Sequence, residues 1–259
     1  VGFPWSKESV ARSLSSTGGT IAATHAVCGA EHGGARFAGH LAGGTHHAFA
    51  DHGEGFCVFN DIAVAARVAL RDYPLVVQRV LVVDLDVHQG NGCAHIFAAD
   101  ESVFTFSLHC SANYFSKKQT SSLDVEVSAG VNDKAYMAAL RMHLPRVFEL
   151  ARPQLTFFQA GVDPHEADAF GKMKLSSAGL KQRNHMLFEA ATAANSRVVV
   201  TMGGGYPRDL DVNSRPFLQV CQAHMDVYRA CAVMHPAACR RALDDGARER
   251  AHPGELSQA

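Results

Sequence analysis

Residues 79–92 read RVLVVDLDVHQGNG, an apolar run that ends in a polar segment containing two glycines. Three other runs have the same character, namely VFTFSLH (103–109), LTFFQAG (155–161) and RVVVTMGGG (197–205). Nearly continuous apolar runs of this length are typical of strands buried on both faces, as in a parallel sheet. The four runs therefore predict neighbouring strands of one sheet.

Helical patterns separate these runs. Apolar residues recur with a helical period within 58–71 and over 140–151, and a further helix is expected over 177–195. Alternating strands and helices predict an α/β fold in which a mainly parallel sheet carries helices on both faces. Sheets of this kind bind ligands beyond the carboxyl ends of their strands. The polar and glycine-rich segments that follow the apolar runs are expected there.

Local signals refine this prediction. Asn60 or Asp61 is the expected N-cap of the helix within 58–71. Pro145 is expected to weaken or kink the second helix. Segment 111–132 is expected to be a long loop containing a short extended piece at 123–127.

The overall composition limits the class of protein. A chain of 259 residues can bury one large core, and we expect one domain over residues 1–235 and a poorly ordered tail over 236–259. Lys and Arg number 24 against 25 Asp and Glu, which disfavours direct binding of nucleic acid. No apolar run has the length of a membrane span. The oligomeric state does not follow from these features.

The cysteines and the first residues bear on location. Seven cysteines occur singly, which disfavours a disulfide framework and fits a reducing compartment. We expect an intracellular protein, cytoplasmic or nuclear. Because the sequence does not begin with Met, an organellar targeting segment could precede it.

A metal site is predicted after the first run. Asp84, Asp86 and His88 are two residues apart, so strand geometry lets their side chains converge. Asp163 follows a second apolar run, and a hydrolytic zinc site needs three protein ligands and an open position. Alone, an Asp-x-His at a strand end is more often a structural cap. His165 is a competing ligand, but we expect it to be a solvated residue at the rim.

Two other segments supply groups for proton transfer. LAGGTHHAF (41–49) holds the adjacent histidines His46 and His47, and imidazole exchanges protons near neutral pH. Buried Asp84 and Asn91 are available to hydrogen-bond one ring each. TMGGGYPRD (201–209) contains glycines that let the backbone approach a ligand and bring Tyr206 to the site.

A narrow apolar channel is the functional interpretation of a third group of residues. Phe56 could belong to the core, or could face Tyr114 or Phe115 across a channel that an aliphatic lysine stem would fill. The residues expected to line this channel are Gly55, Phe56, Tyr114, Phe115, Gly204 and Gly205.

The chain resembles the zinc-dependent histone deacetylase family. The motifs GGTHHAF, GFCVFND, DLDVHQGNG, SLH, QAGVDPHEADAFG and GGGY occur in the family's order between about residues 17 and 210. TGGTI (17–21) and HQGNG make it most similar to class IV and bacterial enzymes. The family normally has another strand before TGGTI, so we expect this sequence to be truncated at its N-terminus.

The resemblance implies the three-layer arginase/deacetylase-type fold and one zinc ion on Asp86, His88 and Asp163. It also implies that His47 is the general base, that His46 is its electrostatic or acid partner, and that Tyr206 polarises the scissile amide. A potassium ion is implied beside the zinc. Its implied ligands are the side chains of Asp84 and Ser107 with the backbone carbonyls of Asp86, His88 and Leu108.

We therefore expect a zinc-dependent hydrolase that removes acetyl or longer acyl groups from lysine ε-amino groups of histones or other proteins. An acylpolyamine or small-molecule amidohydrolase of the same fold and a catalytically silent acyl-lysine-binding scaffold are the alternatives. An arginase-like dimanganese site is disfavoured, because Gly90 and His165 stand where further carboxylates are needed. Asp51, Glu54, Glu166 and Asp168 could form an acidic rim that attracts cationic substrates, although carboxylates in loops are more often simply solvated.

Overall fold

The central sheet is entirely parallel. The structure is a computed structural model that describes residue 2 and residues 4–29, 35–114 and 116–234. Within these residues, six strands form one sheet in the order β1-β6-β5-β2-β3-β4, and each neighbouring pair is parallel. The strands are β1 (Phe37–His40), β2 (Val80–Asp84), β3 (Val103–Cys110), β4 (Leu123–Val127), β5 (Leu155–Gln159) and β6 (Arg197–Thr201). The four apolar runs are β2, β3, β5 and β6, which confirms the predicted parallel sheet.

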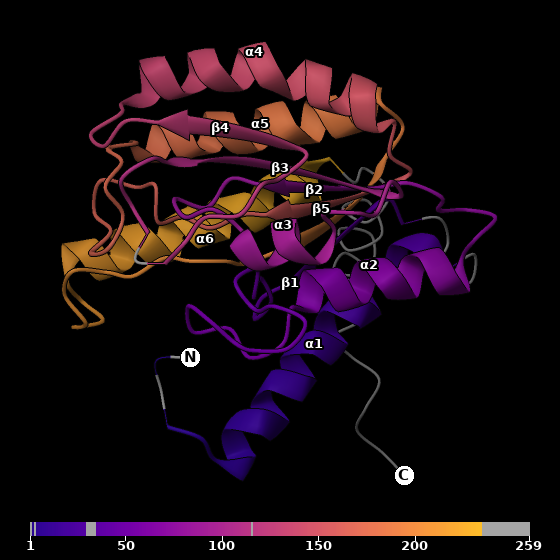
Figure 1. The fold of residues 1–259 in the computed structure, drawn as a ribbon. Coiled ribbons are helices and arrows are strands. Elements are labelled where there is room, and N and C mark those ends of the chain that lie inside the picture. Colours follow the sequence, from indigo (N-terminus) through magenta and orange to yellow (C-terminus); the bar gives the residue numbers. More distant parts are fainter. Residues whose placement is uncertain (1, 3, 30–34, 115, 235–259) are drawn as a thin grey trace, which may run out of the picture.

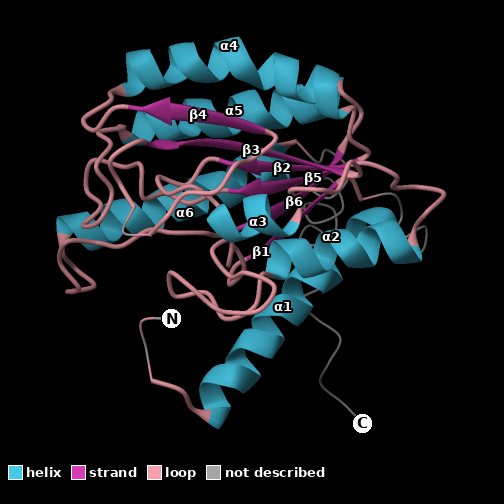
Figure 2. Ribbon diagram, viewed as in Figure 1, coloured by secondary structure: helices cyan, strands magenta, loops and turns pink. Residues whose placement is uncertain are grey.

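Helices cover both faces of this sheet (Figures 1 and 2). Leu81 and Val83 of β2 lie in the core shared with α4, α5 and α6, whereas Val80 and Val82 lie in the core shared with α1, α2 and α3. The split follows from strand geometry, because successive side chains point to opposite faces. The helices are α1 (Lys7–Cys28), α2 (Asp61–Asp72), α3 (Asn91–Ile96), α4 (Asp133–Ala151), α5 (Ser177–Ala193) and α6 (Arg215–Val233).

Three elements, α2, α4 and β4, bear on the local sequence signals. Asn60 is the N-cap of α2, since its side chain accepts a hydrogen bond from the backbone N–H of Ala63, and Asp61 is the first helical residue. α4 continues through Pro145, which lies on its exposed side. Residues 123–127 form the edge strand β4 with alternating burial.

Four elements were not predicted. These are α1, β1, α3 and α6, of which α1 is the long indigo helix in Figure 1. α1 contains SLSSTGG, whose Ser, Thr and Gly residues have low helix propensity. Packing against α2 and β1 stabilises this helix, and such tertiary contacts cannot be inferred from a local pattern. The predicted disordered tail over 236–259 lies outside the described residues.

The register of the sheet brings polar residues to one edge. Asp84 at the end of β2 pairs with Ser107 of β3 and with Gln159 of β5, and Gln159 pairs with Thr201 of β6. Because all these strands are parallel, the loops that follow them leave on the same side. The functional segments predicted from the sequence therefore meet there. Of the helices in the described part of the chain, none has the length and hydrophobicity needed to cross a bilayer.

Candidate metal centre and active site

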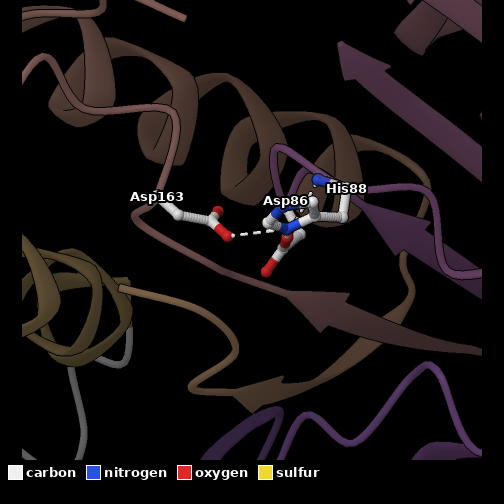
Figure 3. Close-up of side chains that lie close together, drawn as sticks. All are labelled: Asp86, His88 and Asp163. Carbon is white, nitrogen blue, oxygen red and sulfur yellow. Dashed lines mark hydrogen bonds and ion pairs between the residues drawn. The ribbon is translucent and has the colours of Figure 1, made fainter. Parts of the chain in front are cut away.

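Three side chains converge beyond the carboxyl ends of β2 and β5. Asp86 and His88 follow β2 and Asp163 follows β5, and each offers one ligand atom within 4.8 Å of the others (Figure 3). Asp86 and Asp163 are buried, whereas His88 retains partial solvent access. The structure thus brings together the three residues that the sequence analysis selected.

The polar atoms of this group suit a cation. His88 Nδ1 lies 3.1 Å from Asp86 Oδ1 and 3.1 Å from Asp163 Oδ2. Among the described residues, Asp163 Oδ2 is buried without a well-directed hydrogen bond. A buried carboxylate needs a nearby positive charge, so this oxygen, which already lies against His88 Nδ1, favours a cation at this position. Two carboxylates and one imidazole form a donor set that zinc and other first-row ions accept, with room for a further ligand.

The electrostatics of the group point the same way. Burial raises the pKa of Asp163 to about 7. Burial opposes the charged form of His88, but attraction to Asp163 and Asp86 outweighs it and raises the pKa of this imidazole to about 10. The two carboxylates therefore hold positive charge at the point where the three side chains meet.

The backbone is shaped to keep these carboxylates in place. Asp163 Oδ1 accepts a hydrogen bond from the N–H of Val87 at 2.9 Å, and Asp86 Oδ2 accepts one from the N–H of Gly204 at 2.9 Å. A Cβ atom at Gly204 would lie 2.3 Å from Asp163 Oδ2. Only glycine lets the loop after β6 approach the carboxylates this closely.

Adjacent histidines lie beside the metal group with different partners. Their ring centroids are 3.9 Å apart. His46 Nδ1 lies 2.6 Å from Asp84 Oδ2, and His47 Nδ1 lies 2.8 Å from Asn91 Oδ1. The structure therefore places Asp84 and Asn91 against one ring each, as expected from the sequence.

The two imidazoles have opposite charge preferences. Burial opposes the charged form of His46, but attraction to Asp84 and Asp86 outweighs it and raises its pKa to about 9. Burial and the neighbouring positive charge of His46 lower the pKa of His47 well below its usual range. At neutral pH the pair can supply one positive charge and one neutral base, the division of roles that acid–base catalysis requires.

Tyr206 comes to the site on the loop after β6. Its backbone N–H donates to Asp168 Oδ2 at 2.6 Å, which fixes the loop, and its ring packs against Phe170 with centroids 5.0 Å apart. Tyr206 lines both an outer cavity and an inner cavity at the metal group. Gly205 lies against Val162 and His224.

The outer cavity has a volume of about 370 Å³ and leads from the surface to the metal group. Tyr114 stacks on His47 with centroids 4.8 Å apart, and half-exposed Phe56 lies 6.3 Å from the ring of Tyr206. An inner cavity of about 140 Å³ continues past Gly204. The residues that line the outer cavity are His47, Gly55, Phe56, His88, Asn113, Tyr114, Phe170, Lys172 and Tyr206. Phe115 lies outside the described residues.

Three lining residues were missed by the sequence analysis. Phe170 belongs to QAGVDPHEADAFG, and an aromatic so close to a predicted ligand was a usable signal. Asn113 and Lys172 are joined by a hydrogen bond of 2.5 Å from the N–H of Lys172 to Asn113 Oδ1. No local sequence pattern predicts this contact, because the two residues are far apart in the sequence.

Two expectations for the loop after Asp163 are wrong. His165 was expected to be solvated, but it is buried, accepts a hydrogen bond from the N–H of Ala167 and contacts Ser177 Oγ. Asp168 was expected to be solvated or part of an acidic rim, but its buried carboxylate accepts hydrogen bonds from three backbone N–H groups. The loop folds onto itself, so its polar side chains satisfy backbone groups.

The residues expected to hold potassium lie next to the metal group. Asp84 and Ser107 are register partners on β2 and β3, and both are buried with Leu108. Ser107 Oγ is 2.9 Å from His109 Nδ1. The potassium site itself stays a prediction.

Comparisons with known proteins agree with the geometry. Residues 2–221 match the family described as histone deacetylase domain. An uncharacterized protein of Picosynechococcus sp. is 43% identical over 210 residues, which are 81% of this chain and 68% of that protein. Histone deacetylase 2 of Arabidopsis thaliana is 33% identical over 169 residues, 64% of this chain and 43% of the relative.

The chain is also similar to a relative with lower sequence identity and to a solved structure. Acetoin utilization protein AcuC of Staphylococcus aureus is 28% identical over 180 residues, 64% of this chain and 46% of the relative. The chain thus spans less than half the length of these two named relatives. The crystal structure of the HDA15 HD domain is similar with a TM-score of 0.65 at 24% identity, over 86% of this chain and 71% of that one. This likeness confirms the expected arginase/deacetylase-type fold.

Proposed function

This chain belongs to the histone deacetylase domain family of hydrolases, and we propose that it is a zinc-dependent deacylase acting on acyl-lysine. The reaction would release acetyl or longer acyl groups from the ε-amino group of lysine in a protein or peptide. We assign the activity to the domain of residues 1–235. The observation that carries the proposal is the convergence of Asp86, His88 and Asp163 at the base of an apolar cavity.

The metal has a defined part in this proposal. Asp86, His88 and Asp163 would hold one zinc ion, which when bound lowers the pKa of water towards about 7 and polarises a carbonyl group. A potassium ion beside Asp84, Ser107 and Leu108 would add positive charge to this buried acidic region. The support for potassium is the family membership and the burial of these groups.

The chain's own residues supply the remaining chemistry. His47, which is neutral because burial and His46 lower its pKa, would accept the proton of the attacking water. Charged His46 stabilises developing negative charge, and either histidine can protonate the leaving lysine amine. The hydroxyl of Tyr206 would donate a hydrogen bond to the oxyanion of the tetrahedral intermediate.

The outer cavity favours a lysine side chain. Phe56, Tyr114 and Phe170 give it mainly apolar walls, which suit the four methylene groups of a lysine stem and would exclude water from the reacting amide. Lys172 also lines this cavity, while Asp168 is buried and unavailable to substrate. A polycationic acylpolyamine would therefore be attracted less than an acyl-lysine peptide.

The experiment that tests the proposal measures zinc content and turnover together. The purified chain should bind one zinc ion and hydrolyse acetyl-lysine or longer acyl-lysine peptides, and a chelator should abolish the activity until zinc is restored. An acylpolyamine panel of the same acyl lengths serves as the comparison. Zinc binding without turnover of any substrate would favour a silent acyl-lysine-binding scaffold. Faster turnover of acylpolyamines would overturn the substrate assignment.

A further inference from the structure

A buried amide lies between a predicted base and a carboxylate. Asn91 is buried, its Oδ1 lies 2.8 Å from His47 Nδ1, and its Nδ2 donates to Glu54 Oε1 at 2.9 Å. An ionised carboxylate can only accept hydrogen bonds. Glu54 therefore requires the NH₂ end of Asn91 to face it, and the oxygen end must face His47.

This orientation determines where His47 carries its proton. Asn91 Oδ1 can only accept, so His47 Nδ1 must donate. In a neutral imidazole the other nitrogen, Nε2, then holds the lone pair that can accept a proton. If the amide turned over, its NH₂ group would face Nδ1 and favour a proton on Nε2, which would leave the ring unable to act as a base through that atom.

Glu54 is itself held in place for this task. Tyr114 Oη donates to the same Oε1 atom at 2.7 Å, and the Tyr114 ring stacks on His47. His52 Nε2 lies 4.0 Å from the other carboxylate oxygen. Burial opposes ionisation of Glu54, but the hydrogen bonds from Tyr114 and Asn91 outweigh it and lower its pKa. The carboxylate is therefore a permanent acceptor at neutral pH.

We propose that Glu54 is a positioning residue that orients the amide of Asn91 and thereby keeps the proton of His47 on Nδ1. The proposal rests on the proposed function, because it assigns a consequence to the role of His47 as general base. Glu54 acts through Asn91 and does not itself touch the reacting groups.

The test compares one substitution in two backgrounds. In the parent chain, Glu54→Gln replaces a strict acceptor by an amide that can also donate, so kcat should fall about tenfold with little change in KM. In the Asn91→Asp background a carboxylate accepts from His47 in either orientation and is repelled by Glu54. There Glu54→Gln should raise kcat, since its NH₂ group can donate to the new carboxylate.

The direction of the change in kcat that Glu54→Gln causes in each background distinguishes a positioning role of Glu54 from a merely structural one. A merely structural role for Glu54 would lower kcat in both backgrounds, and that outcome, or no change in the parent chain, would overturn the proposal. Glu101→Gln, at an exposed glutamate, is the control and should leave kcat unchanged. Thermal melting checks that each variant is folded.

A second readout does not depend on turnover. Long-range ¹H–¹⁵N NMR spectra of ¹⁵N-histidine-labelled protein distinguish the two imidazole tautomers, and the His47 signals are assigned by their loss in His47→Gln. The parent should show the proton on Nδ1, and Glu54→Gln should show a mixture. If no acyl substrate is hydrolysed but the tautomer shifts, the proposed function fails and this inference stands. If turnover is present and the tautomer is unaffected, the inference fails alone.

Discussion

The guanidinium group of Arg183 donates a hydrogen bond to the carbonyl oxygen of Gly161 at 2.6 Å, beneath the strand end that carries Asp163. The same side chain donates to the carbonyl of Leu85, next to Asp86, at 3.1 Å and to that of Ala160 at 3.3 Å. Arg183 comes from α5 and is fully buried. One cation therefore ties together the two chain segments that hold the predicted metal ligands.

The first prediction concerns the hydrogen bonds of Arg183 to these backbone carbonyl groups. Arg183→Met should destabilise the protein by about 3 kcal/mol, because it leaves buried carbonyl groups without a donor. The segments before Asp86 and Asp163 should also become less well ordered, which should weaken zinc binding. Denaturant unfolding and zinc titration measure the two effects. Arg146→Met, at an exposed arginine on α4, is the matched control and should change neither. Unaltered zinc affinity in a destabilised variant would limit Arg183 to a structural role.

The second prediction concerns the metal ligands. Asp163→Asn replaces a charged ligand by a neutral amide, so bound zinc should fall from one ion per chain to a small fraction and activity should be lost. Elemental analysis after dialysis measures the zinc content. A variant that retained stoichiometric zinc would show that Asp163 is not a ligand.

The third prediction separates catalysis from metal binding. Tyr206→Phe removes only a hydroxyl group, so zinc content should be unchanged while kcat falls about 10²- to 10³-fold, the usual loss for one oxyanion donor. Steady-state kinetics with the best acyl-lysine peptide provide the measurement. Activity close to that of the parent chain would refute the role assigned to Tyr206.

The fourth prediction concerns the mouth of the outer cavity. Lys172 lines this cavity and its Nζ donates to the carbonyl of Ala112 at 2.8 Å. Lys172→Glu should raise kcat/KM several-fold for peptides with cationic residues beside the acyl-lysine, relative to neutral peptides, and added salt should reduce the gain. Lys172→Gln loses the same contact without reversing the charge, so its effect should be intermediate. Equal changes for cationic and neutral peptides would argue against an electrostatic effect.

The fifth prediction is a pH dependence of stability. His224 on α6 is buried, and burial together with Arg183 lowers its pKa to about 4, below the value of about 6.5 expected in the unfolded chain. The unfolded state therefore binds more protons than the folded state between these values. The contribution of His224 to stability is fully present above about pH 6.5 and is lost as the pH falls towards 4.

Urea unfolding of the parent chain and of His224→Leu provides the measurement. Between pH 7.5 and 4.5 the parent should lose roughly 2 to 3 kcal/mol more stability than the variant. Because other titrating groups are common to both proteins, the difference isolates His224. Parallel losses over this range would show that the imidazole is not held neutral by the fold.

Much of the fold could be read from local patterns. The apolar run before Asp84 and its three counterparts are the strands β2, β3, β5 and β6, because a strand buried on both faces leaves a signature in its composition alone. α1 could not be read in this way, since its Ser, Thr and Gly residues are weak helix formers and contacts with α2 and β1 stabilise it. Pro145 did not end the predicted helix, because it lies on the exposed side of α4 and the helix continues through it.

Some features of the candidate site could likewise be predicted from the sequence, and others could not. Asp86, His88, His46, His47 and Tyr206 could be selected from the sequence because each stands in a short motif next to a predicted strand end or glycine turn. The burial of His165 could not be foreseen, since it depends on how the loop after Asp163 folds back towards Ser177.

The sequence alone was enough to predict the parallel strands and to select the candidate metal ligands and the paired histidines, because periodicity and motif spacing are properties of neighbouring residues. Only the tertiary structure shows the hydrogen bonds that join Glu54 to Asn91 and Asn91 to His47. The same holds for the hydrogen bond from Arg183 to the carbonyl oxygen of Gly161. Both depend on side chains that are distant in the sequence and meet only when the sheet and its helices pack. Hydrogen-bond direction and buried charge are set by that packing.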